Sequence, residues 1–221
     1  MENGLLDLSS GELLPHSPDH LCTVQLPVRH DPDATCPHID QFVRDTFPED
    51  AFDLAYELLA LVMVPDPSIQ KAVLLLGPGG NGKSVWLRVM QRFLGPDNYS
   101  TVPLQRLEAE RFSASRLQGM LANICADLPA TDLKSSSVFK GITGGDRITA
   151  ERKYHDSYDL YPFCKLIFSA NTAPRTPDAS DAFFQRWIVV PFDRTFRGEV
   201  TEIPSRELDA RLHDQRNCRV C

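Results

Sequence analysis

An eight-residue segment, Gly77-Pro-Gly-Gly-Asn-Gly-Lys-Ser84, limits the fold of this 221-residue chain more than any other feature. It matches the pattern G-x-x-x-x-G-K-[ST], in which glycines let the backbone wrap a polyphosphate and point successive N–H groups at its oxygens. An apolar run at 72–77 precedes the segment, and a helical pattern follows at 83–93. This order predicts a nucleotide-binding P-loop. A glycine turn that binds nothing is the alternative interpretation.

Each position of this loop has a predicted contact with ATP or Mg²⁺. Lys83 is expected to reach the outer phosphates, and Ser84 to offer its hydroxyl to Mg²⁺. The helix that follows directs the positive end of its dipole at the same place. The residues predicted to bind ATP are Gly77, Pro78, Gly79, Gly80, Asn81, Gly82, Lys83 and Ser84. The loop alone does not separate a motor protein from a small-molecule kinase.

Three further apolar runs each adjoin a polar residue with a catalytic interpretation. The runs are 121–126, 165–170 and 187–190. Asp127 follows the first and is placed to hold Mg²⁺ or polarise the attacking water, and Asn171 follows the second and is placed to bond the γ-phosphate. Arg186 precedes the third and is placed to stabilise charge in the transition state. Strands that alternate with helical segments, such as 104–118, predict an α/β fold in which helices sandwich a parallel sheet.

The chain ahead of this sheet predicts a different organisation. Residues 1–35 are rich in Pro, Asp and His, which predicts an irregular entry with one or two short strands, and the alternating stretch 22–27 is one candidate. The segments 38–47 and 50–63 look helical, and in the second of them apolar residues recur at three- and four-residue spacing. These segments predict a small helical unit that leads into the sheet.

Charge is distributed unevenly along the chain, whose formal net charge is −7. Residues 1–70 hold 13 acidic and 2 basic side chains, a net of −11, whereas 71–221 hold 17 acidic and 21 basic, a net of +4. The mildly basic part carries the motifs, which weakly favours a polyanionic partner. No apolar run approaches the roughly 18 residues of a membrane span, and the N-terminus lacks a basic region ahead of an apolar one. We therefore expect a cytosolic protein without a membrane partner.

The motifs, taken in order, resemble those of the phage and plasmid primase–helicase family, whose relatives include the poxvirus primase–helicase. The segments that carry this resemblance are 77–84, 126–129, 139–153, 169–175 and 183–192, preceded by 3–8 and 31–37. Together they cover residues 1 to about 208, nearly the whole chain. The ordered set is far more specific than the P-loop alone.

The resemblance implies a superfamily 3 DNA helicase with an AAA+-like core that works as a homo-hexamer in a bacterial host or a mobile element. ATP would then lie between subunits, so Arg186 would act on the neighbour's nucleotide. A hairpin within 148–160 would point into the ring channel and grip single-stranded or forked DNA, and a primase would be a partner that this segment does not contain. The residues to which the resemblance gives a DNA contact are Lys140, Arg152, Lys153 and His155.

The resemblance also divides the chain. Composition and periodicity predict an irregular segment at 1–35 and a helical unit at 36–68. The resemblance adds an ATPase core at 69–208 and ends before a tail at 209–221, whose sequence departs from the family and suggests a truncated product.

Two positions differ from the family pattern, and two other functions stay open. Asp127 stands alone where relatives carry Glu or a paired acid, and Gln185 occupies the position of a second Arg. A P-loop kinase acting on a small substrate would need neither the basic hairpin nor Arg186. A truncated remnant that binds ATP or DNA without turnover is the other alternative.

Overall fold

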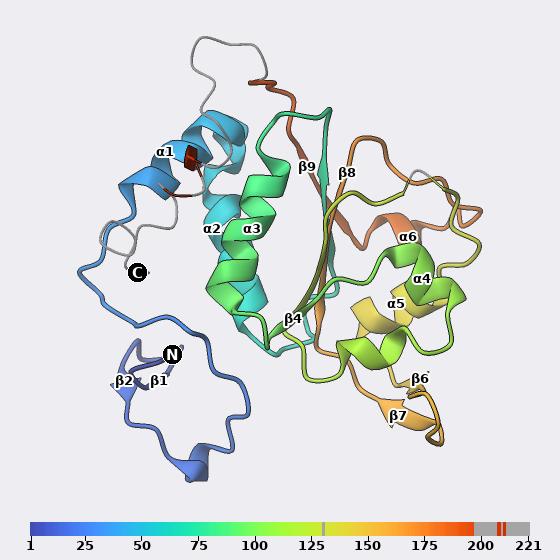
Figure 1. Ribbon diagram of the computed structural model, residues 1–221, viewed down its shortest axis with the longest axis horizontal. Coiled ribbons are helices and arrows are strands. Elements are labelled where there is room, and N and C mark those ends of the chain that lie inside the picture. The colour runs from blue at the N-terminus through green and yellow to red at the C-terminus, as the bar shows by residue number, and fades with distance from the viewer. Residues whose placement is uncertain (130, 197–206, 209, 211–221) are drawn as a thin grey trace.

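A five-stranded parallel sheet forms the centre of the computed structural model, which describes residues 1–129, 131–196, 207–208 and 210 (Figure 1). Every neighbouring pair of strands is parallel, so all carboxyl ends lie at one edge. In spatial order the strands are β4 (Tyr99–Ser100), β5 (Ala122–Cys125), β8 (Lys165–Ala170), β3 (Ala72–Leu76) and β9 (Trp187–Pro191).

Helices cover both faces of the sheet (Figure 1). One face carries α1 (Pro37–Thr46), α2 (Phe52–Met63) and α3 (Lys83–Leu94), and the other carries α4 (Leu104–Ala109), α5 (Ser137–Gly144) and α6 (Asp181–Phe184). Successive side chains of a strand point to opposite faces. In β3, Val73 and Leu75 therefore join the core beneath α1–α3, while Ala72 and Leu74 join the core beneath α4–α6.

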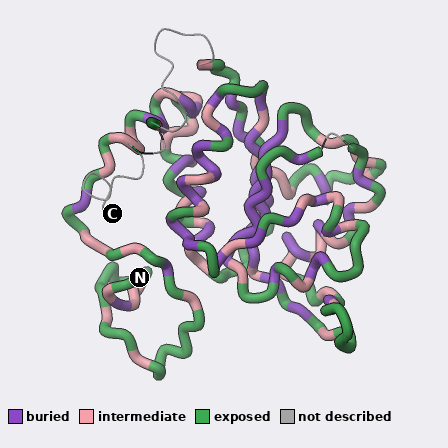
Figure 2. Tube along the Cα trace, in the orientation of Figure 1, coloured by how far each residue is buried: buried purple, intermediate pink, exposed green. Residues whose placement is uncertain are grey.

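Burial on both faces explains why the central strands are uninterrupted apolar runs. All six residues of β8 are buried, as are the first four of β3 (Figure 2). The predicted α/β fold, a parallel sheet sandwiched by helices, is confirmed, and with the loop after β3 it is the fold of a P-loop NTPase.

The N-terminal segment is irregular, but its strands are not where alternation suggested. A short antiparallel pair, β1 (Leu5–Leu6) with β2 (Leu13–Leu14), forms instead, and the candidate stretch 22–27 has no strand pairing. Backbone groups in and beside that stretch bond elsewhere: the Asn98 side chain donates to the Gln25 carbonyl at 2.8 Å, and the Glu2 N–H donates to the Val28 carbonyl at 2.8 Å. This part also contains a 3₁₀ turn, η1 (Pro18–His20), and a second one, η2 (Glu49–Ala51), lies between α1 and α2.

The helix predicted at 104–118 is wrong in its length. The segment contains α4 and a separate 3₁₀ turn, η3 (Ala114–Leu117). Glu110 adopts extended backbone angles, and its carboxylate holds Arg106 at 2.7 Å and the Ser113 hydroxyl at 3.1 Å. These local side-chain bonds stabilise a bend in place of a continuous helix.

An antiparallel hairpin projects from the α4–α6 side of the molecule (Figure 1). It consists of β6 (Ile148–Ala150) and β7 (Tyr158–Leu160), with Ala150 opposite Tyr158. The hairpin predicted within 148–160 is therefore present. Among the described residues no helix is both long and apolar enough to span a bilayer.

Replacing Asn123 by alanine is expected to lower the free energy of unfolding by about 2–3 kcal/mol, because buried backbone groups lose their partners. Asn123 is fully buried in β5, where it accepts from the Val102 N–H at 2.7 Å and donates to the Val102 carbonyl at 2.8 Å. Urea unfolding would measure the change. Gln41→Ala, at an exposed position of α1, is the control and should stay within about 0.5 kcal/mol of wild type. A loss below about 1 kcal/mol for Asn123→Ala would contradict this account.

Candidate functional site

Three polar segments meet at the carboxyl edge of the sheet because the strands that precede them are parallel neighbours. The P-loop follows β3, Asp127 comes two residues after β5, and Asn171 directly follows β8. Strand β8 pairs with both β5 and β3, so Asn171 follows a strand that lies between those leading to Asp127 and to the P-loop. The edge of a parallel sheet at the strands' carboxyl ends is where ligands bind in folds of this class.

Glycine is required at two points of the P-loop. Gly77 has a φ of +156°, and a Cβ there would lie 2.2 Å from the Phe192 carbonyl oxygen. Gly82 has a φ of +92°, and a Cβ there would lie 2.8 Å from Thr46 of α1. The loop is therefore pressed between the chain after β9 and the N-terminal helical unit. Any side chain at either glycine would change the loop's shape.

Lys83 is the first residue of α3, and its ammonium group lies inside the loop. It donates to the carbonyls of Gly77 at 2.6 Å and Pro78 at 2.8 Å, and to the Asn81 side chain at 3.1 Å. The Asn81 amide in turn donates to the Phe192 carbonyl at 2.7 Å. Burial lowers the pKa of Lys83, and the negative charge of Asp127 opposes that change.

The residues at this edge fit a magnesium-bound nucleoside triphosphate. Ser84 and Asp127 are exposed and offer a hydroxyl and a carboxylate, which are the oxygen ligands that Mg²⁺ prefers. The twelve-residue α3 begins at the loop and directs its positive end there. Gly79 and Gly80 are exposed, and the space around a Cβ at Gly79 is open. A polyphosphate can therefore approach the backbone closely.

Asp127 has a strained backbone that a neighbouring strand holds in place. Its φ is +61°, a conformation that costs on the order of 1 kcal/mol for a residue with a Cβ. The Ser169 hydroxyl accepts from the Asp127 N–H at 3.1 Å, and the Ser169 carbonyl accepts from the Leu128 N–H at 2.7 Å. Ser169 lies in β8, two residues before Asn171. The orientations of Asp127 and Asn171 are thus tied through one strand, a link that sequence analysis missed.

Arg186 lies at the opposite edge of the sheet from the P-loop of the same subunit. The Ala72 N–H donates to the Arg186 carbonyl at 2.7 Å, which places Arg186 beside the start of β3. The five residues of β3 separate that point from the P-loop, and at about 3.3 Å a residue the distance is about 16 Å. The guanidinium donates to the Ala182 carbonyl, and its buried Nε has no hydrogen-bond partner among the described residues. An arginine side chain cannot cross this distance to its own nucleotide.

The candidate DNA-binding residues Arg152, Lys153 and His155 are exposed on the turn of the β6–β7 hairpin. A turn bond joins the His155 N–H to the Arg152 carbonyl at 3.0 Å. Tyr154, between them, is 90% exposed with a φ of +67°, and the Lys153 ammonium lies 5.0 Å from its ring centre. The tip of the hairpin thus carries an exposed lysine and an exposed aromatic ring, while the Arg152 guanidinium lies 5.7 Å from the centre of the Tyr158 ring.

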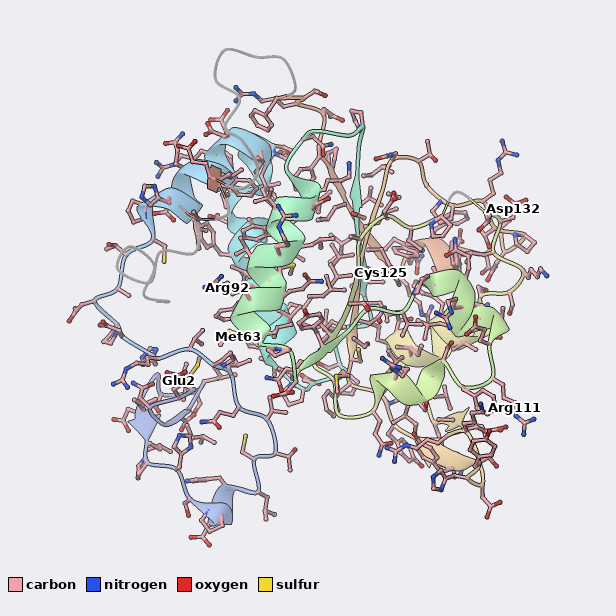
Figure 3. All side chains as sticks on the ribbon, in the orientation of Figure 1. Glu2, Met63, Arg92, Arg111, Cys125 and Asp132 are labelled. Atoms are coloured by element: carbon pink, nitrogen blue, oxygen red, sulfur yellow. The ribbon has the colours of Figure 1, made fainter. Side chains whose placement is uncertain are left out.

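Sequence analysis missed a second segment that supports this tip. Arg111, at the hairpin end of the molecule (Figure 3), pairs with Glu151 of the hairpin. The Gln118 side chain accepts from both Arg152 and Tyr158 at 2.8 Å. Gln118, Arg152, His155 and Tyr158 line a hollow of about 250 Å³. These contacts join positions about 40 residues apart, so no local pattern reveals them.

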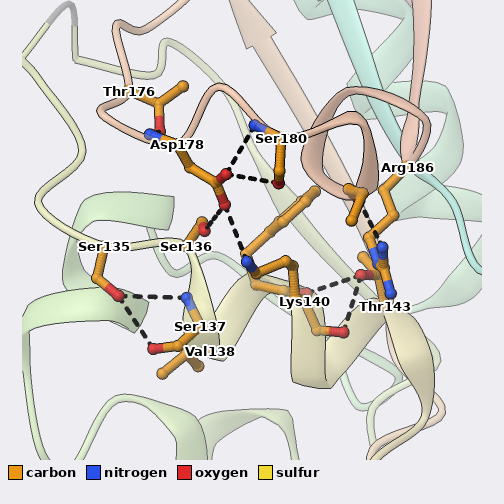
Figure 4. Close-up of polar contacts among 12 residues, drawn as sticks. Ser135, Ser136, Ser137, Val138, Lys140, Thr143, Thr176, Asp178, Ser180 and Arg186 are labelled. Carbon is orange, nitrogen blue, oxygen red and sulfur yellow. Dashed lines mark hydrogen bonds and ion pairs between the residues drawn. The ribbon is translucent and has the colours of Figure 1, made fainter.

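Lys140, the fourth residue expected to contact DNA, is not on the hairpin. It lies on α5, and its ammonium pairs with Asp178 at 2.9 Å (Figure 4). The structure therefore gives this cation a protein partner, and its contact with DNA stays a prediction. The tail predicted at 209–221 lies outside the described residues apart from Ala210.

The fold and the P-loop define the class of this protein, a P-loop NTPase, and comparison with known families narrows it. Residues 75–186, about half of the chain, match a family described as a family of unknown function (DUF5906). Residues 1–48 match a second model, described as D5 N terminal like. The chain belongs to this DUF5906 primase–helicase family and carries a D5-like N-terminal segment, which confirms the family that the motifs indicated.

Similar proteins include viral proteins named as helicases. The chain is 30% identical over 203 residues to "Putative helicase L207/L206" of Acanthamoeba polyphaga mimivirus, an alignment that covers 86% of this chain and 21% of that protein. It is 26% identical to "Putative helicase 184R" of Invertebrate iridescent virus 6, covering 93% of this chain and 23% of that protein. The chain thus spans about a fifth of the length of these relatives.

Among solved structures, the apo form of the NrS-1 C terminal region superimposes with a TM-score of 0.63 at 16% identity, over 90% of this chain and 48% of that chain. At this identity the likeness concerns the fold alone.

Proposed function

We propose that this chain is the ATPase motor of a ring-shaped DNA helicase, which hydrolyses ATP between subunits and moves along DNA during replication of a phage, plasmid or other mobile element. The observation that carries the proposal is the position of Arg186. It lies at the amino end of β9, across the sheet from the P-loop that follows β3. An arginine with a catalytic role there has to serve a nucleotide on another subunit.

The residues at the carboxyl edge divide the work of hydrolysis. Lys83 would move from the loop carbonyls to the outer phosphates. There its ammonium would offset the negative charge that develops on the leaving group. Ser84 and Asp127 would hold Mg²⁺, which supplies further neutralisation of phosphate charge. Asn171, beside Asp127, would orient the attacking water with its amide. Arg186 of the neighbouring subunit would complete the site, so a single subunit would hydrolyse ATP slowly.

The hairpin supplies the proposed contact with DNA. Arg152 and Lys153 are exposed cations that bind phosphates without reading sequence, and Tyr154 offers a ring on which a base can stack. Arg111 and Gln118 brace the hairpin from a separate segment. A ring of such hairpins would line a channel for single-stranded or forked DNA. We propose a homo-hexamer, in which 69–208 form the motor, 36–68 support the P-loop and 1–35 precede it.

The test of this function combines hydrolysis, DNA binding and assembly. ATP hydrolysis by the wild-type chain is expected to rise on adding single-stranded DNA, and analytical ultracentrifugation is expected to show a hexamer when nucleotide is present. Arg152→Ala with Lys153→Ala should abolish most of the stimulation. It should also reduce the slope of log Kd against log salt by about 0.7 for each DNA phosphate that the variant no longer binds.

A matched double variant, Arg92→Ala with Lys134→Ala, removes two exposed cations outside the hairpin and should behave as wild type. Hydrolysis by a monomer that ignores DNA would reject the motor and favour a small-molecule kinase. ATP binding without turnover or assembly would instead identify a non-catalytic remnant.

A further inference from the structure

Helix α5 lies beside both segments that follow the candidate catalytic residues, since one leads into it and the other contacts it through Asp178. In the chain, Asp127 precedes the described segment 131–136, which leads to α5, and Asn171 begins the loop 171–180, which leads to α6. The Leu133 N–H donates to the Arg175 carbonyl at 2.8 Å and joins the two loops midway. A displacement of either candidate catalytic residue would therefore shift the chain near the first turn of α5.

The Asp178 carboxylate joins the second loop to that helix (Figure 4). Its Oδ2 accepts from the Ser136 hydroxyl and from the Lys140 ammonium, the latter at 2.9 Å. Its Oδ1 accepts from the Ser180 N–H at 3.0 Å and from the Ser180 hydroxyl at 2.6 Å. With four donors on two oxygens, the carboxylate cannot rotate without breaking bonds to both segments.

These contacts keep Asp178 ionised. Hydrogen bonds from Ser136, then from Ser180 and Lys140, hold the pKa of its carboxyl well below the usual range. The Asp178 side chain is 16% exposed and the Lys140 side chain 36% exposed, so the pair is partly shielded from water. Solvent screens such a pair less than a fully exposed one, and charge-assisted bonds of this kind are stronger than neutral ones.

The carboxyl end of α5 is joined to the hairpin by a short connection. The Gly145 N–H donates to the Ile142 carbonyl at 3.2 Å, and the Asp146 N–H donates to the Gly141 carbonyl at 2.9 Å, which closes the helix just before β6. A Cβ at Gly141 would lie 3.0 Å from the Ile148 side chain, so the last turn of α5 packs directly on the first residue of β6. A shift of α5 is thus carried into the hairpin.

The same helix also packs against the turn that carries Arg186. The Phe139 ring stacks on Trp187 with centroids 4.7 Å apart and packs on Phe183 at 5.2 Å. These two partners flank Arg186 in the chain. Helix α5 therefore contacts the start of the hairpin, the loop after Asn171 and the residues around Arg186.

We infer that Asp178 is a positioning residue that couples the nucleotide state sensed at Asn171 to the orientation of α5 and of the β6–β7 hairpin. The inference rests on the proposed function. Lys140 acts here as the partner of Asp178. Coupling between two sites needs a physically continuous element that both can displace, and the Asn171 loop, Asp178 and α5 form one.

Amide hydrogen exchange tests this coupling without relying on hydrolysis. In the wild-type chain, adding Mg²⁺ with a non-hydrolysable ATP analogue is expected to change the exchange of the amides in 148–160. Asp178→Asn should lose most of this change, and its ratio of DNA-stimulated to DNA-free hydrolysis should fall about tenfold, within the usual range for coupled sites. Asp181→Asn, at an exposed carboxylate three residues away, is the control and should respond as wild type.

Lys140→Met provides the second variant, with thermal unfolding measured for all proteins to confirm that they fold. If the pair acts as a unit, Lys140→Met reproduces the loss and the double variant is no worse than either single one. Additive losses would instead place Lys140 on DNA and overturn the inference. The inference would also be overturned if the nucleotide-dependent change in amide exchange of 148–160 persisted in Asp178→Asn or was absent from wild type. A wild type that lacks DNA stimulation but shows the Asp178-dependent response would reject the proposed function and leave this coupling standing.

Discussion

Lys83→Met is expected to lower the rate of ATP hydrolysis by about 10²–10³-fold, the effect of removing one charge-stabilising donor from an active site. The Lys83 residue is 6% exposed and its ammonium sits among three oxygens of the loop, so it is already at the place where the phosphates would bind. Methionine keeps the length of the side chain and removes the donor. Phosphate release at saturating Mg·ATP would measure the rate, and calorimetry the affinity.

Lys134→Met is the matched control, since Lys134 is an exposed lysine on the loop after Asp127, and it should hydrolyse ATP at the wild-type rate. Hydrolysis by Lys83→Met within about threefold of wild type would mean that the loop does not bind the transferred phosphate, and the assignment of this edge as the nucleotide site would fail. Thermal unfolding of both variants separates a loss of chemistry from a loss of folding.

Arg186→Ala is expected to reduce kcat by about 10³-fold while ATP still binds, because an arginine that completes a neighbour's site acts on the transition state and not on the bound substrate. Arg186 is across the sheet from its own P-loop, so its loss leaves the contacts of Lys83 intact. Single-turnover hydrolysis and nucleotide binding, measured together, check both halves of this expectation.

Mixing the two inactive variants gives the sharpest test of a shared site. In a mixed ring, some interfaces pair an intact P-loop from an Arg186→Ala subunit with an intact Arg186 from a Lys83→Met subunit. Activity should therefore reappear on mixing, although each variant alone is inactive. Failure to restore any hydrolysis in assembled rings would argue that Arg186 has a structural role within its own subunit, as its bond to the Ala182 carbonyl also permits.

The central strands and the P-loop could be predicted because their causes are local or depend on burial alone. A parallel strand covered on both faces has to be apolar along its length, and β3 and β8 appear as such runs in the sequence. Elements whose stability comes from distant partners were missed: the two-residue β4, which pairs with β5, and the four-residue α6. Neither is long enough to show a period.

Two sequence patterns misled for the same physical reason. The alternating stretch at 22–27 has the period of a strand, but it pairs with no strand in the described part of the chain, and its backbone bonds to Asn98 instead. The segment 104–118 has helical character, but the side chain of Glu110 stabilises a bend in its middle. The periodicity of apolar residues indicates which secondary structure a segment favours in isolation. Hydrogen bonds to other residues then decide which backbone conformation it adopts in the folded chain.

The candidate residues divide in the same way, into those placed by local sequence and those placed by contacts between distant segments. The place of Asp127 and Asn171 at one edge of the sheet could be predicted because each follows an apolar strand, and parallel strands bring their carboxyl ends together. The pairing of Lys140 with Asp178 spans 38 residues, and no spacing in the sequence predicts it. The resemblance therefore assigned Lys140 to DNA, where the structure shows a contact between helix α5 and the loop that carries Asp178.

The sequence by itself determined that this chain forms a P-loop on a parallel sheet, because glycine conformations, strand burial and helix periodicity are properties of neighbouring residues. It also determined which polar residues lie at strand ends. Only the tertiary structure decided that β8 separates β3 from β5, that Arg186 lies across the sheet from its own P-loop, and that α5 joins the hairpin to Asp178. These features depend on the order of strands in space and on contacts between distant segments, which follow from packing the whole chain around one sheet.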